Sequence, residues 1–191
     1  MKEDILSKQI NWAFDLSQKA LNSKARREKG ILFKKSSRIY ADILKTDPKN
    51  FSALMGLART HLHSKRFGEA QRVYEMALKI SKKEQRHRIY NGLANVSRYM
   101  ADYLPEGEDL QKKAIKRYRL AIKSVPFKNS GLYWSNLSVA YASLRHWDKA
   151  IGAAKKAISI LKKDDAPHGN QLNILFLEIK LYKEYKKRTL L

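Results

Sequence analysis

Histidine is the side chain in this 191-residue sequence that is best suited to metal binding or proton transfer, and the spacing of the five histidines favours neither. His61 and His63 are two residues apart, so on a helix they point in different directions and cannot readily share one metal ion. No HExxH motif occurs. The other histidines are scattered: His87, His146 and His168. We therefore predict no metal-binding residues.

The remaining reactive residue types also argue against an enzyme. The absence of cysteine excludes a disulfide framework, cysteine-ligated zinc and a thiol nucleophile. The glycines are isolated and form neither a GxxxxGK[ST] nor a GxGxxG phosphate loop. The acidic residues do not cluster on an apolar face as a catalytic pair would. We predict no catalytic or cofactor-binding residues and no cofactor.

The composition predicts a folded, all-α chain. Apolar residues make up 43%, enough for a core, whereas 8 Gly and 4 Pro are too few for the many tight turns of an all-β chain. The longest apolar stretches fall far short of the ~20 residues that span a bilayer. The N-terminal residues lack the apolar region of a secretory signal. We expect a soluble, cytoplasmic protein without membrane insertion.

Three segments share a repeated pattern, which indicates stacked helix pairs. The first half of each has a large residue, a leucine and a small residue at offsets of three and four, and the second half repeats alanine at similar offsets. The matching sets are Leu54-Leu57-Ala58, Tyr90-Leu93-Ala94 and Trp134-Leu137-Ser138, followed by Ala70-Tyr74-Ala77, Ala114-Tyr118-Ala121 and Ala150-Ala154-Ala157. The small residues let two helices approach closely while the large ones fill the space beside them.

This pattern resembles the tetratricopeptide repeat (TPR), a helix-turn-helix unit of about 34 residues. Trp134-x-x-Leu137-Ser138-x-x-Tyr141 carries the resemblance most closely, and Ala150 and Ala157 follow it at the family's spacing. Pro48 and Pro126 fall near the family's repeat-ending proline. The resemblance covers roughly residues 30–164. It implies an all-α, right-handed TPR-like α-solenoid with a C-terminal capping helix.

The expected organisation is a single array over residues 1–191. It comprises a degenerate N-terminal helix pair at 1–50, repeats at 51–84, 85–128 and 129–165, and a C-terminal helix at 168–188. Gly30 is predicted to form the first turn, after a helix running from about residue 4 to 27. The inward residues of that helix are predicted to be Ile5, Ile10, Trp12, Leu16, Ala20 and Leu21. The middle repeat carries an inserted acidic segment around 101–110, which is either a connector or an intramolecular gate.

The resemblance also implies a binding groove, because the first helix of each TPR pair lines a concave surface that takes peptides. Carried over to this sequence, the groove candidates are Arg59, Arg88, Asn91, Asn95, Arg98 and Asn136. An asparagine amide both donates and accepts hydrogen bonds, as binding to an extended peptide backbone requires. Gly56 and Gly92 occupy equivalent positions and either admit a partner's backbone or serve helix packing.

The net charge of +22 suggests a polyanionic partner. The densest group of cations is predicted to share one side of a helix that begins near residue 111, and it consists of Lys112, Lys113, Lys116, Arg117, Arg119 and Lys123. Such a row could follow a phosphate backbone. Alternatively, these cations form only a solvated helix face without a binding role.

The C-terminal helix is predicted to be apolar on two sides. Leu172, Leu175, Phe176, Ile179 and Tyr182 form one stripe, and the other consists of Ile174, Leu177, Leu181 and Tyr185. One stripe suffices to pack on the last repeat, so the second needs another cover: a second copy of the chain, a partner, or the array itself if the helix folds back. Our hypothesis is that this second face mediates self-association.

The sequence therefore favours a non-catalytic protein-interaction module, an adaptor or scaffold that binds an acidic peptide or protein segment in its groove. One alternative is a basic nucleic-acid- or ribosome-associated factor. A further alternative is a self-assembling structural oligomer.

Overall fold

The computed structural model describes residues 2–126, 130–163 and 169–189, and these residues form nine α-helices, a short 3-10 helix and no strand. The expected all-α, TPR-like class is confirmed. The chain divides into two compact units, Met1–Lys82 and Lys83–Leu191. The single-array organisation stays a prediction, and His168, with the expected start of the last helix, lies outside the described residues.

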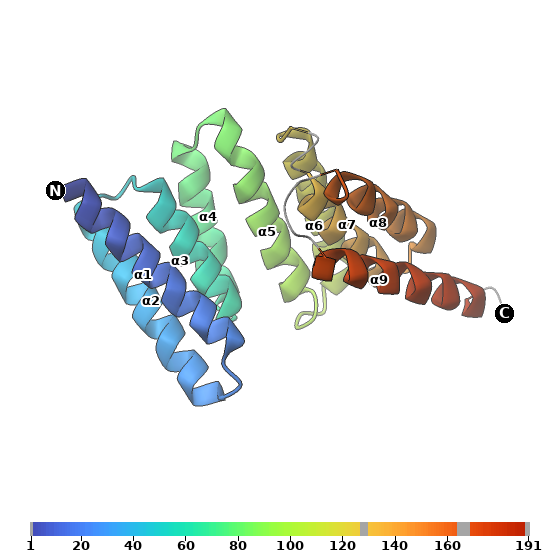
Figure 1. Cartoon of the computed structure of the whole chain (residues 1–191), viewed down its shortest axis with the longest axis horizontal. Coiled ribbons are helices and arrows are strands. Elements are labelled where there is room, and N and C mark those ends of the chain that lie inside the picture. The colour runs from blue at the N-terminus through green and yellow to red at the C-terminus, as the bar shows by residue number, and fades with distance from the viewer. Residues whose placement is uncertain (1, 127–129, 164–168, 190–191) are drawn as a thin grey trace. The chain divides into compact units, whose positions relative to one another are not determined.

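The first unit contains two helix pairs (Figure 1). They consist of α1 (Lys2–Asn22), α2 (Arg26–Thr46), α3 (Phe51–His63) and α4 (Phe67–Ile80). Within this unit α2 also packs against α3, and α1 contacts α3. The side chain of Asn50 caps α3 by accepting a 2.9 Å hydrogen bond from the Ala53 amide, which satisfies one donor of the first turn.

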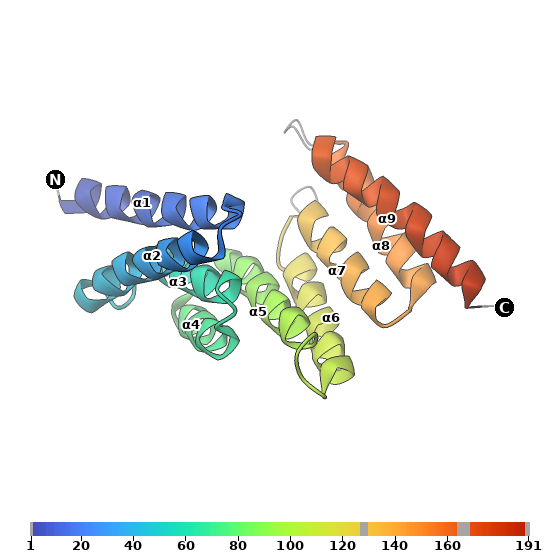
Figure 2. The ribbon, with the colours of Figure 1, turned by 90° about the horizontal axis from the view of Figure 1, so that it is seen from below.

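The second unit contains two further pairs and a last single helix (Figure 2). Its elements are η1 (Lys83–Gln85), α5 (Arg86–Met100), α6 (Gly107–Lys123), α7 (Gly131–Ser143), α8 (Trp147–Leu161) and α9 (Gly169–Arg188). Helix α6 packs against α7, and α9 packs against α8.

Small residues at the repeated positions bring the helices of each pair together. The alanines predicted from the repeat are fully buried: Ala58, Ala70, Ala77, Ala94, Ala114, Ala121, Ala150, Ala154 and Ala157. Aromatic rings fill the space beside them, as Tyr74 and Tyr118 do. Gly56 belongs to this packing, because a Cβ there would lie 2.3 Å from Cζ of buried Tyr40 on α2.

A cluster of three buried hydroxyl groups joins α1, α2 and α3. Ser17 Oγ lies 2.7 Å from Ser36 Oγ and 2.8 Å from Thr60 Oγ1. The Ser36 hydroxyl also donates a 2.7 Å hydrogen bond to the Ala13 carbonyl, which completes this hydrogen-bond network. These bonds satisfy polar groups that water cannot reach, so the cluster stabilises one specific packing of the three helices.

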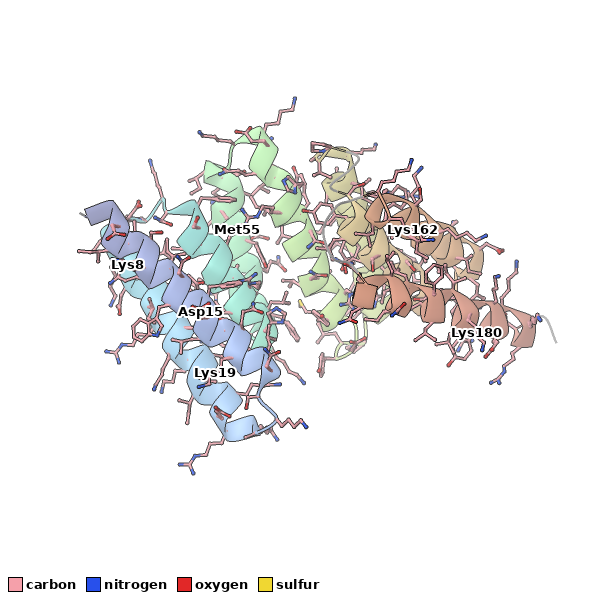
Figure 3. All side chains as sticks on the ribbon, viewed as in Figure 1. Lys8, Asp15, Lys19, Met55, Lys162 and Lys180 are labelled. Atoms are coloured by element: carbon pink, nitrogen blue, oxygen red, sulfur yellow. The ribbon has the colours of Figure 1, made fainter. Side chains whose placement is uncertain are left out.

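The cluster explains why the predicted inner face of α1 was partly wrong. Ala13, Ser17 and Ala20 are the buried residues of α1, whereas Ile5 is 54% exposed and Trp12 is 60% exposed. Leu21 is exposed as well. The exposed side of α1 also carries Lys8, Asp15 and Lys19, which are labelled in Figure 3. Small residues pack closest, so the large apolar side chains are displaced outward.

The first turn of the chain also differs from the prediction. Helix α1 ends at Asn22 and α2 begins at Arg26, so Gly30 lies inside α2 and not in the turn. The Ser23 hydroxyl organises the turn, since its Oγ accepts from the Ala25 amide at 3.2 Å and donates to Glu28 Oε2 at 2.8 Å. Such a serine bends the chain without glycine.

Two repeats share one turn geometry. Lys65 follows α3 with φ of 63°, and Arg145 follows α7 with φ of 56°. The next amide bonds back to the helix in both cases, Arg66 N to His61 O at 2.8 Å and His146 N to Tyr141 O at 3.0 Å. This left-handed residue closes the helix and directs the chain into its partner.

The loop in the acidic segment is shorter than predicted, because the second part of the segment is helical. Helix α6 begins at Gly107, so Glu108 and Asp109 lie in its first turn, where carboxylates stabilise a helix N-terminus. Lys112 pairs with both, at 2.7 Å from Glu108 Oε1 and 3.6 Å from Asp109 Oδ1. These contacts stay within one helix, which favours the connector interpretation over the gate.

The position of Gly30 inside α2 predicts whether an alanine substitution there stabilises or destabilises the protein. Nothing lies within 4 Å of a Cβ built there, so Gly30→Ala should raise the unfolding free energy by about 0.5–1 kcal/mol through helix propensity. Gly56→Ala is the matched variant in the same unit. It should lower stability by about 1–2 kcal/mol because the added methyl overlaps the Tyr40 ring. Urea unfolding followed by circular dichroism would measure both, and a destabilised Gly30→Ala would contradict the helical assignment.

Candidate functional site

Two asparagines of successive repeats form the centre of the candidate site in the second unit. Asn136 Nδ2, on α7, donates a 2.9 Å hydrogen bond to Asn91 Oδ1, on α5. Both side chains are half-buried. The bond uses one acceptor of Asn91 and one donor hydrogen of Asn136, so each amide retains hydrogen-bonding groups. The structure thus brings together two of the predicted groove candidates, and α5 and α7 present a polar seam.

Asn95 and Arg98 continue this surface one turn further along α5. Tyr118 of α6 donates from its hydroxyl to Asn95 Oδ1 at 2.6 Å. The Arg98 guanidinium carbon lies 4.2 Å from the centre of the neighbouring Tyr99 ring, and its side chain is half-buried. Asn95 and Arg98 are thus held in fixed orientations by aromatic neighbours.

Burial raises the pKa of Tyr118 to about 12, an effect that the positive charge of nearby Arg98 partly offsets. The neutral phenol is therefore the stable form over the physiological range, and it remains a hydrogen-bond donor to Asn95.

The candidate groove helices carry no acidic residue. Their sequences are FSALMGLARTHLH for α3, RHRIYNGLANVSRYM for α5 and GLYWSNLSVAYAS for α7. Each of the other six α-helices contains at least one aspartate or glutamate. Exposed Arg88 and half-buried Arg98 therefore give the α5 surface a positive potential without an acid on its own helix.

Arg59 lies in the first unit and makes a local contact there. Its guanidinium carbon is 4.6 Å from the centre of the Phe14 ring of α1, and the side chain is half-buried. The cation–π contact orients Arg59, which the sequence singled out, whereas Phe14 was missed because the pattern of α1 was misread.

The six predicted polyanion-binding cations do not form one equivalent row. Arg117 is half-buried and donates through Nη1 to Leu93 O at 3.0 Å and to Ser97 Oγ at 2.7 Å, so it joins α6 to α5. Lys112 pairs with acids of its own helix. The remaining four are exposed along α6: Lys113, Lys116, Arg119 and Lys123.

His87 has a structural partner that its isolation in the sequence does not reveal. Its Nδ1 lies 2.6 Å from the Tyr133 hydroxyl of α7, and burial lowers the pKa of the imidazole. The bond joins α5 to α7 beside the asparagine pair. Both residues lie in the first turn of their helices, at positions that are not equivalent in the repeat alignment, so the repeat pattern does not reveal the contact.

Neither metal binding nor membrane insertion finds support in the part of the chain that the structure describes. Within residues 2–126, 130–163 and 169–189, no three histidine, aspartate or glutamate side chains come together as metal ligands. Across those same ranges, every helix is too short or too polar to cross a membrane.

Comparison with known proteins gives one family match and several similar chains. Residues 33–94 match the model of a tetratricopeptide repeat family. The RNA polymerase-associated protein CTR9 of Saccharomyces cerevisiae is 24% identical over 176 residues, which are 86% of this chain and 15% of that protein. This chain thus spans a small part of the curated relative that it matches.

Two crystal structures of MamA resemble the fold. One has a TM-score of 0.61 at 24% identity and covers 85% of this chain and 82% of its own. The other has a TM-score of 0.59 at 23% identity and covers 95% of this chain and 84% of its own. At such identities the similarity concerns the fold alone.

The raised pKa of Tyr118 predicts a pH dependence of stability. With a folded pKa of about 12 and an unfolded value near 10, the stabilisation is complete below pH 10. It is lost as the pH rises from about 10 to 12, because the unfolded chain releases the proton first. Below pH 10, Tyr118→Phe should cost about 1 kcal/mol through the lost bond to Asn95. This deficit should shrink above pH 10.

Urea unfolding midpoints from pH 8 to 11.5 would measure the difference between the two proteins. Tyr103→Phe is the control, since Tyr103 is exposed and should follow the parent protein at every pH. If the unfolding midpoints of Tyr118→Phe and of the parent protein changed in parallel with pH, the raised pKa of Tyr118 would be contradicted.

Proposed function

Since this chain is a protein of the tetratricopeptide repeat family, we propose that it is a non-catalytic adaptor or scaffold that binds an acidic protein segment on the α5–α7 surface. Proteins of this family bind other proteins. The cytoplasmic location stays a prediction from the sequence.

The acid-free composition of α5 and α7 carries this proposal. Arg88 and Arg98 would attract a carboxylate, and the sequences of α5 and α7 contain no aspartate or glutamate that would repel one. The Asn91–Asn136 pair adds short-range groups that can bond the backbone of an extended segment. Charge therefore supports the choice of an acidic partner, and the amides support its orientation.

A second candidate function is nucleic-acid binding, which the exposed cations of α6 favour. Lys113, Lys116, Arg119 and Lys123 are all exposed on one helix. Phosphate contacts of this kind would lose affinity steeply as salt rises. No aromatic residue among them offers a stacking platform for bases, which leaves this the weaker candidate.

The proposal predicts binding of an extended acidic peptide that depends on α5 and α7. A fluorescein-labelled peptide of alternating Glu and Ser should bind, and its Gln-for-Glu counterpart should bind at least about tenfold more weakly. Arg88→Gln and Asn136→Ala should each reduce affinity about five- to tenfold, measured by fluorescence anisotropy with circular dichroism to verify folding.

The matched control removes charge from α6. The double variant Lys116→Gln/Arg119→Gln should leave peptide affinity within about twofold once the lost net charge is screened by salt. If the α6 double variant and the α5 variant Arg88→Gln lost peptide affinity equally, binding at a specific α5–α7 surface would be contradicted. Tight oligonucleotide binding abolished by the α6 variant would favour the second candidate instead.

A further inference from the structure

The hydrogen bonds of the two α5 asparagines fix which end of each amide faces away from the core. Asn91 Oδ1 accepts from Asn136 Nδ2 of α7 at 2.9 Å, and Asn95 Oδ1 accepts from the Tyr118 hydroxyl of α6 at 2.6 Å. The oxygen and the nitrogen of an amide diverge from one carbon, so a bond to the oxygen turns the nitrogen the other way. Both asparagines therefore direct their Nδ2 donors away from the groups that hold their oxygens.

Arg98 settles the direction of the bond between Tyr118 and Asn95. Its guanidinium lies within hydrogen-bonding reach of the Tyr118 hydroxyl, which belongs to the partner helix of α5 in the pair (Figure 2). A guanidinium can only donate, so the Tyr118 oxygen accepts from Arg98 and its single proton goes to Asn95. An amide nitrogen does not accept such a proton, and Oδ1 is the acceptor that Asn95 provides.

Burial makes this orientation of Asn95 costly to change. Tyr118 is fully buried, so water cannot take its proton if the Asn95 amide turns over. The Tyr118 hydroxyl would then be a buried donor without an acceptor, which folded proteins avoid. The half-buried Asn95 is therefore held with its oxygen inward and its two N–H donors outward.

The groove candidates of α5 form a row that offers donors to a ligand. At about 100° per residue, Arg88, Asn91, Asn95 and Arg98 fall within an arc of about 80° on one side of the helix. The guanidinium groups have donors only, and both amides present their nitrogens. Asn95 and Arg98 are three residues apart and therefore neighbours on the helix surface, so one ligand group can contact both.

Such a pair of donors distinguishes a carboxylate from a carboxamide. A carboxylate has acceptors only, so it binds where donors face it and is repelled where an amide oxygen does. A carboxamide both donates and accepts, so it adapts to either orientation of Asn95. The orientation of Asn95 therefore matters for an acidic side chain and hardly matters for its neutral amide counterpart.

We propose that Tyr118 is a positioning residue that makes the α5 row selective for carboxylate side chains, because it holds Asn95 with its donors toward the ligand. A carboxylate of the bound segment contacts Asn95 and Arg98, whereas Tyr118, buried beneath them, touches no ligand. The proposal rests on the proposed function, which assigns an acidic segment to the α5–α7 surface.

Tyr118→Phe tests this selectivity with the alternating Glu/Ser peptide and its Gln-for-Glu counterpart. Without the hydroxyl, Asn95 is free to present its oxygen, so affinity for the Glu peptide should fall about fivefold. Affinity for the Gln peptide should stay within about twofold, since a carboxamide binds either orientation. A general loosening of the fold would instead weaken both peptides alike and leave their affinity ratio unchanged. Fluorescence anisotropy measures both affinities, and circular dichroism verifies folding.

Tyr133→Phe is the matched control on α7. Tyr133 is also buried, but its hydroxyl bonds His87 and no asparagine of the row, so the affinity ratio should equal that of the parent protein. A surface control lies on α9, where the residues that the sequence assigned to self-association are all exposed: Ile174, Leu177, Leu181 and Tyr185. Their self-association stays a prediction, and Leu177→Ser should change neither peptide affinity.

NMR of the parent protein observes the same amide without relying on the stability of a variant. The Asn95 Nδ2 protons, assigned by their loss in Asn95→Ser, should move downfield when the Glu peptide binds, because they donate to a carboxylate. The Gln peptide should move them less, since its bond to Asn95 is not charge-assisted.

Two results would overturn this proposal and leave the proposed function in place. One is an unchanged ratio of the two peptide affinities in Tyr118→Phe. The other is Asn95 Nδ2 protons that do not move when the Glu peptide saturates the protein. If the parent protein binds neither peptide, or if Arg88→Gln leaves Glu peptide binding intact, the proposed function itself fails and this inference fails with it.

Discussion

Close approach of helices through alanine, glycine and serine is the constraint on which the rest of this structure depends. A helix pair meets at fully buried small residues, and tyrosine rings fill the space on either side. Gly56 shows how little room remains, because even one methyl group would meet the Tyr40 ring. Packing this dense fixes the orientation of each helix about its own axis. The outward residues then follow from the inward ones.

The candidate site is a direct consequence of this packing. Asn91 and Asn136 are 45 residues apart in sequence, yet a hydrogen bond of 2.9 Å joins them because α5 and α7 lie at neighbouring positions in successive repeats. The His87–Tyr133 contact connects the same two helices one turn earlier. The two repeats of the second unit therefore contribute polar positions to a common surface, and a substitution that loosened the alanine contacts between their helices would separate these groups without contacting them.

Repeat spacing identified the core of the second unit because each buried position recurs with the same residue size. The pattern of α1 was misread for a physical reason: its inner stripe includes Ser17, which a hydropathy pattern assigns to solvent. Ser17 is buried because Ser36 and Thr60 satisfy its hydroxyl, and their positions in the sequence give no sign of that. Arg117 was predicted to be one of the cations available to a polyanion for a similar reason, since its acceptors Leu93 O and Ser97 Oγ lie on another helix. Interactions along one helix could be predicted, whereas bonds between helices could not.

A net charge of +22 attracts many polyanions, so charge by itself cannot select one partner. Exposed lysines on α6 and α9 are screened by salt beyond about 8–10 Å, and they act chiefly on the rate of encounter. Selection requires groups whose geometry is fixed before binding. The asparagine pair on α5 and α7 meets this requirement, since a hydrogen bond orders it. Long-range charge and short-range shape thus act at different stages of the same association.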